Sequence, residues 1–333
     1  MAETLSGGPN YGPGGPTPYP LPGVLPGNAM DPWLDSSIGG DVRGPITTIQ
    51  PNGRILRRPQ RAKFFTYVNT FEPLAAGAVA VRDSFQVDGD ANFWIFKQAV
   101  LAFTEAGAVQ RDDTIGFEVS PISEAYQFQP LFLANFGSGR FPNQESPPII
   151  LPRTAIWTAV ANSRNLAGLP TFIFVAHHGA KVYRQPFIRA RLYQQQKFFS
   201  YPANFTANDG GVGTIPAGQT SIATVRVDGG SDFDVRRLTL VADGPCTIQI
   251  KSDDDNWFQR PLRGELLGQS GIVAPSVAQG AFSGELPFWL PCPRFVTKAG
   301  YINAQITNLD LVNAIRVQLI FHGNRLYPGG GLR

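Results

Sequence analysis

Three phrases of this sequence occur twice in the same order, and this repetition limits the possible folds more than any other feature. The phrases and their copies are K-F-F-T-Y (63–67) with K-F-F-S-Y (197–201), V-D-G-D-A-N-F (87–93) with V-D-G-G-S-D-F (227–233), and H-G-A-K-V-Y (178–183) with H-G-N-R-L-Y (322–327). A single short match would prove little, because Asp-Gly turns are common. Ordered matches at both ends of each copy indicate a tandem duplication of a unit of roughly 130 residues.

Two shorter matches fall in the same order. Pro152-Arg153 matches Pro293-Arg294, and Asn165-Leu166 matches Asn308-Leu309. The spacing between matched pairs grows along the chain, as small loop insertions in the second copy would make it do. The predicted parts are an extended arm (1–60), a first domain (61–190), a second domain that repeats it (194–328) and a short flexible tail (329–333).

The composition supplies material for two cores and argues against a grip on nucleic acid. Of the 333 residues, 43% are hydrophobic and 24 are Phe. A domain of this size buries on the order of two thirds of its unfolded surface. Charged residues are only 16% and the formal net charge is +3, whereas a domain that binds nucleic acid is usually strongly basic. Nucleic acid is therefore not an expected partner of the whole molecule.

The two cysteines, Cys246 and Cys292, both lie in the second copy. A duplicated disulfide framework is therefore excluded, and we expect two free, partly buried thiols rather than one bridge. No apolar run approaches the ~18–20 residues of a membrane span, so no membrane partner is expected. Because the N-terminus lacks a basic segment followed by an apolar core, we expect synthesis and folding in a cytoplasm.

The first 30 residues are rich in Gly and Pro, which disfavour both helices and central strands. The segment nevertheless carries Tyr11 and Tyr19, and Trp33 follows it. It is either a disordered tail or an extended arm that lies along a partner subunit and inserts these aromatic side chains. In the second case its prolines would lower the cost of ordering, and removal of residues 1–50 should leave the body folded but unable to assemble.

One dense basic run follows the arm and contains Arg54, Arg57, Arg58 and Arg61. Such a run could contact nucleic acid or an acidic protein face. It could equally be a solvated joint between arm and body. Both interpretations stay open on the sequence alone.

The body has the sequence pattern of an all-β fold. Short segments rich in Val, Ile, Phe, Thr and Tyr alternate with Gly, Pro, Asn and Asp. Residues 315–321 alternate between apolar and polar, as in a strand with one buried face. Residues 93–96 and 171–176 are apolar on both faces, as in strands sealed by a neighbouring sheet or subunit. We predict two tandem β-sandwiches, jelly-roll-like in preference to immunoglobulin-like.

The repeated Asp-Gly pairs predict a hairpin-like turn at an equivalent place in each copy. Asp88 and Asp228 tolerate turn geometry, and Gly89 and Gly229 would supply a positive φ at little cost. A β-branched residue at either glycine should then strain the turn.

No catalytic, cofactor or metal site is predicted. The three histidines are His177, His178 and His322, and neither copy offers the further ligands that a repeated metal site would need. Adjacent histidines on a strand point to opposite faces, so His177 and His178 cannot share one metal. The acidic stretch 253–256 lacks the Gly and the distal Glu of an EF-hand and is predicted to be a solvated turn.

Trp257 and Phe258, directly after this acidic stretch, are the best candidates for exposed aromatic residues. On a β-sandwich such a pair could stack against a sugar ring. A carbohydrate-binding module is therefore an alternative function.

The repeated K-F-F-[TS]-Y and H-G-x-[KR]-[VL]-Y phrases, the Gly/Pro-rich arm and the lack of a catalytic set resemble structural proteins of bacteriophage virions. The plan is similar to that of capsid decoration (cement) and minor capsid proteins. The resemblance implies a virion protein assembled in the host cytoplasm, without enzymatic activity. It also implies binding to the major capsid protein or neighbouring subunits, and a homo-oligomer such as a trimer or larger ring.

Other functions remain open on the sequence. The chain could be a tail, collar or receptor-binding spike protein, or a double-jelly-roll major capsid protein. A lectin would expose Trp257 and Phe258 on a concave face. A cupin-type enzyme would place His178 or His322 inside the barrel beside a carboxylate.

Overall fold

The computed structural model describes most of the body of the chain. The described residues are 47–49, 53–57, 61–104, 115–121, 131–132, 136–138, 142–163, 170–185, 191–205, 213–253, 255–269 and 287–328. Within them the protein is built from β-strands and a single short 3₁₀ helix, so the predicted all-β class is confirmed. The arm candidates Tyr11, Tyr19 and Trp33 lie outside the described residues.

The first copy folds into two antiparallel sheets that face each other. One sheet has the order β3 (Ala62–Leu74), β10 (Thr171–Tyr183), β5 (Ala91–Thr104) and β8 (Asn143–Leu151). The other has the order β4 (Val81–Gln86), β9 (Ile156–Ser163), β6 (Ile115–Pro121) and β7 (Leu131–Phe132). The chain alternates between the sheets from β3 to β6, and its last strand returns between β3 and β5. This strand order is that of a jelly roll.

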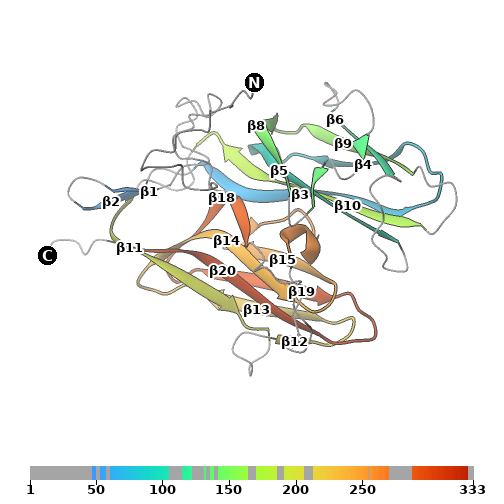
Figure 1. Ribbon diagram of the computed structural model, residues 1–333. Coiled ribbons are helices and arrows are strands. Elements are labelled where there is room, and N and C mark those ends of the chain that lie inside the picture. Colours follow the sequence, from blue (N-terminus) through green and yellow to red (C-terminus); the bar gives the residue numbers. More distant parts are fainter. Residues whose placement is uncertain are drawn as a thin grey trace, which may run out of the picture.

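The second copy repeats this order strand for strand. One sheet runs β11 (Arg191–Ala203), β20 (Ile315–Pro328), β14 (Asp232–Ala242) and β18 (Phe288–Val296), with β12 (Gly213–Ile215) added to β20. The other runs β13 (Thr220–Arg226), β19 (Tyr301–Asn308), β15 (Cys246–Ser252) and β16 (Asp255–Asn256), with β17 (Leu262–Arg263) also on β15. The 3₁₀ helix η4 (Gly264–Leu267) follows β17. The chain is therefore a tandem pair of jelly rolls, which lie against each other in Figure 1.

A short N-terminal hairpin precedes the first jelly roll but pairs with the second. Strand β1 (Thr47–Ile49) pairs with β2 (Ile55–Arg57), and β2 pairs with residues 191–193 at the start of β11. In Figure 1 this hairpin lies beside β11. The range 1–60, predicted as an arm, thus includes a hairpin that is anchored to the second jelly roll.

The repeated Asp-Gly segments do not form hairpins, contrary to the prediction. Strands β4 and β5 belong to different sheets, as do β13 and β14. Each V-D-G segment therefore carries the chain from one sheet of a jelly roll to the other. Turns do occur at Gly89 and Gly229, but neither glycine has a φ in the left-handed region.

The residues with a φ in the left-handed region lie on the loops that contact the V-D-G segments. These loops join β8 to β9 in the first copy and β18 to β19 in the second. Thr154 has a φ of 62° and Ala299 a φ of 60°. The backbone N–H of Val87 donates to Ala155 (2.9 Å), and that of Val227 donates to Gly300 (2.9 Å). Because this register matches Thr154 with Ala299, Pro152-Arg153 corresponds to Thr297-Lys298. The match of Pro152-Arg153 with Pro293-Arg294 was wrong, although the duplication that it supported holds.

A β-bulge recurs at the glycine of each H-G phrase. In the first copy His178 pairs with Lys97 and Gly179 with Ile95, and in the second copy His322 pairs with Arg237 and Gly323 with Val235. A Cβ on Gly179 would lie 2.1 Å from the Trp94 carbonyl oxygen, and one on Gly323 would lie 2.0 Å from the Asp234 carbonyl oxygen. Only glycine fits where the two backbones approach this closely.

Of the two segments predicted to be apolar on both faces, 93–96 is buried on both faces, whereas Phe172 and Phe174 in 171–176 are half-buried. Phe93 and Ile95 of β5 lie in the core of the first jelly roll. Trp94 and Phe96 point to the other side, where they cluster with Cys292 of the second jelly roll. The contact between the two copies is what seals this outer face.

Candidate functional site

The three repeated phrases meet at one place in the first jelly roll. The backbone N–H of Asp88 donates to the Tyr67 hydroxyl (3.1 Å), and the Asp88 carboxylate forms an ion pair with Lys181. The Lys181 ammonium also lies 3.5 Å from the centre of the Phe65 ring. Each phrase contributes one part of this cluster. The cluster links β3, the V-D-G segment that connects the two sheets, and β10.

The second jelly roll contains the same cluster. The backbone N–H of Asp228 donates to the Tyr201 hydroxyl (3.2 Å), and its carboxylate pairs with Arg325 (3.4 Å). The Arg325 guanidinium lies 3.6 Å from the centre of the Phe199 ring. The phrases recur because the same cluster of contacts stabilises each jelly roll. The role of Asp88 and Asp228 in this cluster is structural.

His177 is enclosed in the core of the first jelly roll. Its Nδ1 accepts a hydrogen bond from Gln98 (3.1 Å), and its Nε2 donates to the side-chain oxygen of Asn69 (2.9 Å). Burial lowers its pKa to about 3, so the ring is neutral at physiological pH. With both nitrogens engaged by amides, this histidine has no free atom for a metal or a proton transfer.

The other two histidines occupy equivalent positions on outer sheet faces. His178 accepts from Thr66 (3.0 Å) and donates to the carbonyl of Leu266 in the second jelly roll (3.2 Å). His322 is hydrogen-bonded to Ser200 (2.7 Å) and Thr239 (2.9 Å). Burial lowers the pKa of His178 to about 3 and that of His322 to about 4. No group of three or more His, Cys, Asp or Glu residues that could hold a metal ion occurs within the described residues.

Trp257 and Phe258 are completely buried, so the prediction that they are exposed was wrong. They lie under Phe64 of the first jelly roll, with ring centres 6.4 Å and 6.2 Å away. The backbone N–H of Thr66 donates to the Trp257 carbonyl (3.0 Å), and that of Gln259 donates back to Thr66 (2.9 Å). This segment of the second jelly roll therefore binds the open edge of β3 and joins the two domains.

Charged side chains, some of them buried, also lie between the domains. The Asp255 carboxylate accepts from Arg294 (2.5 Å) and pairs with Lys63 of the first jelly roll (2.6 Å). Burial alone would raise the pKa of Asp255, but the two cations outweigh it and hold the pKa below its usual value. Lys97 donates to the Trp289 carbonyl (3.1 Å), and burial lowers the pKa of Lys97 to about 8. Within the stretch 253–256, Asp255 is thus part of the domain interface rather than of a solvated turn.

The described residues of the basic run lie on different elements. Arg54 is exposed, and Arg57 belongs to strand β2. Arg58 lies outside the described residues. Arg61 is half-buried and lines a pocket.

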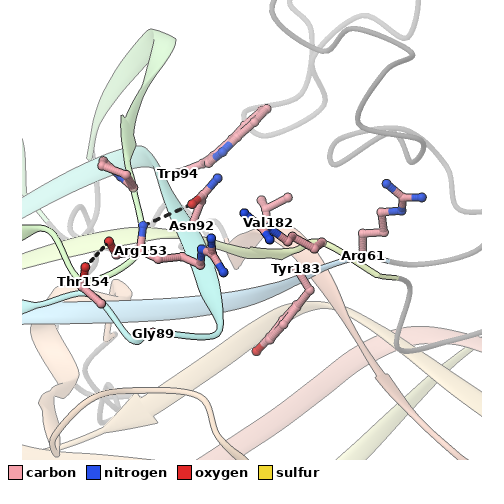
Figure 2. Close-up of a pocket in the computed structure, with 10 residues that line it drawn as sticks. Arg61, Gly89, Asn92, Trp94, Arg153, Thr154, Val182 and Tyr183 are labelled. Carbon is pink, nitrogen blue, oxygen red and sulfur yellow. Dashed lines mark hydrogen bonds between the residues drawn. The ribbon is translucent and has the colours of Figure 1, made fainter.

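This pocket has a volume of about 600 Å³ and is lined by the arginines Arg61, Arg153 and Arg184, together with Asn92, Trp94 and Tyr183 among others. In Figure 2, Thr154 and Arg61 lie at opposite ends of it, with Asn92 between them. Among the described residues that line it there is no His, Cys, Asp or Glu. This described lining is positively charged and supplies no carboxylate or imidazole for acid–base chemistry.

The two cysteines do not form a disulfide, as predicted, and both are buried rather than partly buried. Burial raises the pKa of the Cys246 thiol to about 12, which keeps it protonated and unreactive. Cys292 lies in the cluster between the domains. Within the described residues, no helix is both long and apolar enough to cross a membrane.

No family model matches the sequence, and no curated protein matches it. Some solved structures are weakly similar to the chain. The crystal structure of the infectious bursal disease virus VP2 subviral particle is 8% identical, with 82% of this chain and 74% of that chain covered and a TM-score of 0.24. The crystal structure of the STIV MCP is 8% identical, with 78% of this chain and 96% of that chain covered and a TM-score of 0.17. These are viral capsid proteins, but TM-scores this low do not establish a shared role.

Proposed function

We propose that this chain is a non-enzymatic structural subunit of a virion shell. The observation that carries the proposal is the fusion of two jelly rolls with the same strand order into one body through a buried interface. Jelly rolls occur in viral capsid proteins, in lectins and in cupins. The positions of particular residues argue against a lectin and against a cupin.

A lectin of the kind considered from the sequence needs an exposed aromatic platform. Trp257 and Phe258, the candidates for that platform, are completely buried between the two domains. A cupin needs histidine beside a carboxylate inside the barrel. His178 instead lies between the domains, and His322 lies on an outer sheet face against Ser200 and Thr239.

Within a virion, the fused pair favours a shell-forming subunit of the double-jelly-roll type. Two jelly rolls joined by a shared core form one body of two similar units, which suits lateral packing into a closed lattice. Such a subunit would form homo-oligomers and would contact other virion proteins. A trimer would place six jelly rolls around its axis, two from each chain.

A decoration or minor capsid protein is the second candidate. It is favoured by the Gly/Pro-rich composition of the arm together with the anchoring of hairpin β1–β2 to β11. An arm fixed at this point to the body could tie the subunit to a neighbour on the shell.

Expression of the chain alone separates the two candidates. Mass photometry and electron microscopy of the purified chain should show uniform capsomers or closed particles if it forms the shell. A decoration protein should stay small in solution and should bind to preformed shells when mixed with them. A monomer that neither assembles nor binds shells would contradict both.

A further inference from the structure

One outer sheet face of the second jelly roll repeats the face by which the first jelly roll binds the second. The two faces belong to the equivalent sheets that contain β3, β10 and β5 in the first copy and β11, β20 and β14 in the second. Their matching residues, in register along these strands, are Phe64 with Phe198, Thr66 with Ser200, Lys97 with Arg237, and His178 with His322.

The central pair of side chains has the same geometry in both faces. Phe64 stacks on His178 with ring centres 6.4 Å apart, and Phe198 stacks on His322 with ring centres 6.3 Å apart. A hydroxyl on the first strand is hydrogen-bonded to Nδ1 of the histidine in each case. The second copy thus retains the arrangement that makes a domain contact in the first.

The two faces differ in whether anything covers them. Phe64 is 0% exposed because the second jelly roll lies over it, whereas Phe198 is 61% exposed. The Arg237 guanidinium lies 5.3 Å from the centres of both the Phe198 and the Trp289 rings. An aromatic residue this exposed, held in place by its neighbours, is typical of a residue that anchors a protein contact.

We propose that the Phe198 face, formed by Phe198, Ser200, Arg237, Thr239 and His322, binds the first jelly roll of a second copy of this chain. The contact continues, from one chain to the next, the domain contact that exists within each chain. It is a head-to-tail contact, which forms a ring if the rotation closes. It follows from the duplication and does not depend on a role in a virion.

The register identifies the strand of the partner that would approach this face. Within the chain, the first face is covered in part by the start of β18: the Phe288 ring lies 4.7 Å from His178, and Lys97 donates to the Trp289 carbonyl. Lys97 pairs with Gln144 of β8 in the same way that Arg237 pairs with Trp289 of β18. The start of β8 is therefore the equivalent element of the first jelly roll.

The chemistry of the two surfaces matches. Where β18 begins with Phe288-Trp289-Leu290, β8 begins with Asn143-Gln144-Glu145. The Phe198 face is correspondingly more polar than its counterpart, with Thr239 in place of Ala99 and a guanidinium in place of the buried Lys97 ammonium. Glu145 offers a carboxylate to Arg237, and a polar face of this kind can remain in water before the chains associate.

Sedimentation velocity of the full chain over a range of concentrations tests the proposal. The wild-type chain should associate, and Phe198→Asp should weaken the association about tenfold or more. Ile222→Asp is the matched control, because Ile222 is 64% exposed on the other sheet of the same jelly roll. This control should associate like the wild type, and circular dichroism should show that both variants are folded.

A charge exchange tests the role of β8. Arg237→Glu and Glu145→Arg should each weaken association, and the double variant should restore it. A wild-type chain that stays monomeric, or a Phe198→Asp chain that associates as well as Ile222→Asp, would overturn the docking face. Loss of association with Phe198→Asp but no recovery in the double variant would overturn the assignment of β8.

Discussion

His177 and His178 are neighbours in the sequence, yet each is closed off from water by a different part of the molecule. His177 faces the core of the first jelly roll, and His178 faces the second jelly roll. Each ring accepts one hydrogen bond and donates one, which requires the neutral form. Protonation would leave a buried charge without a partner, which is why the pKa of both rings is low.

These two histidines make stability depend on pH in a defined window. The unfolded chain binds protons on both rings below about pH 6.5, whereas the folded chain does so only near pH 3. Stability is therefore complete above about pH 6.5 and falls as the pH drops toward 3. Between pH 7 and pH 5 each ring should remove about 2 kcal/mol from the free energy of unfolding.

Urea unfolding at pH 7 and pH 5 measures this loss. His178→Gln can donate to the Leu266 carbonyl without titrating. Because the pKa of His322 is also lowered, to about 4, this variant should lose about a third of the pH dependence that the three histidines cause. An unchanged pH dependence in both His178→Gln and His177→Gln would show that the rings are not neutral and buried.

At the scale of the element, substitution should affect stability differently at two glycines. Gly323 lies at the β-bulge between β14 and β20, and Gly229 lies in the segment that connects β13 to β14. Gly323→Ala would bring a Cβ to 2.0 Å from the Asp234 carbonyl oxygen, whereas nothing lies within 4 Å of the Cβ position of Gly229. We expect Gly323→Ala to cost about 3 kcal/mol or more and Gly229→Ala to change stability by less than about 0.5 kcal/mol. Thermal melts of the two variants make the comparison, and equal losses would contradict the bulge geometry.

Equivalent phenylalanines on β3 and β11 should also differ. Phe64 is buried under three aromatic rings of the second jelly roll, so Phe64→Ala should cost about 3–5 kcal/mol. Phe198→Ala, at a concentration where the chain is monomeric, should cost less than about 1 kcal/mol. The measurement is urea unfolding of both variants, and a similar cost for both would mean that the domain contact adds little to stability.

Sequence patterns predicted the features that depend on contacts within one jelly roll. They missed the features that depend on a second sheet or on the other domain. The duplication was visible because Tyr67, Asp88 and Lys181 and their copies must all be kept to fasten each jelly roll. The hairpin was mispredicted because an Asp-Gly turn joins two sheets as readily as two neighbouring strands. The burial of Trp257 was missed because it comes from Phe64, far away in the sequence, and an adjacent acidic stretch suggested exposure. The apolar residues on both faces of β5 were the one sequence signal of the contact between the two domains.

At the scale of the whole molecule, the arm can be tested apart from the body. Strand β1 begins at Thr47, so the deletion that spares the hairpin removes residues 1–46. This deletion should leave the melting temperature of the body unchanged, because a Gly/Pro-rich segment has little apolar material with which to add to a core. Under the arm hypothesis it should abolish joining to the assembly. Complete assembly of the truncated chain, measured by electron microscopy beside the full chain, would refute that hypothesis.

The covalent link between β10 and β11 has a kinetic consequence. A contact between linked domains forms at an effective concentration on the order of millimolar, which dilution does not change. A contact between chains has no such protection. On dilution, an assembly of this protein should therefore come apart into intact pairs of jelly rolls, and on reassembly each collision should add two jelly rolls in a single step.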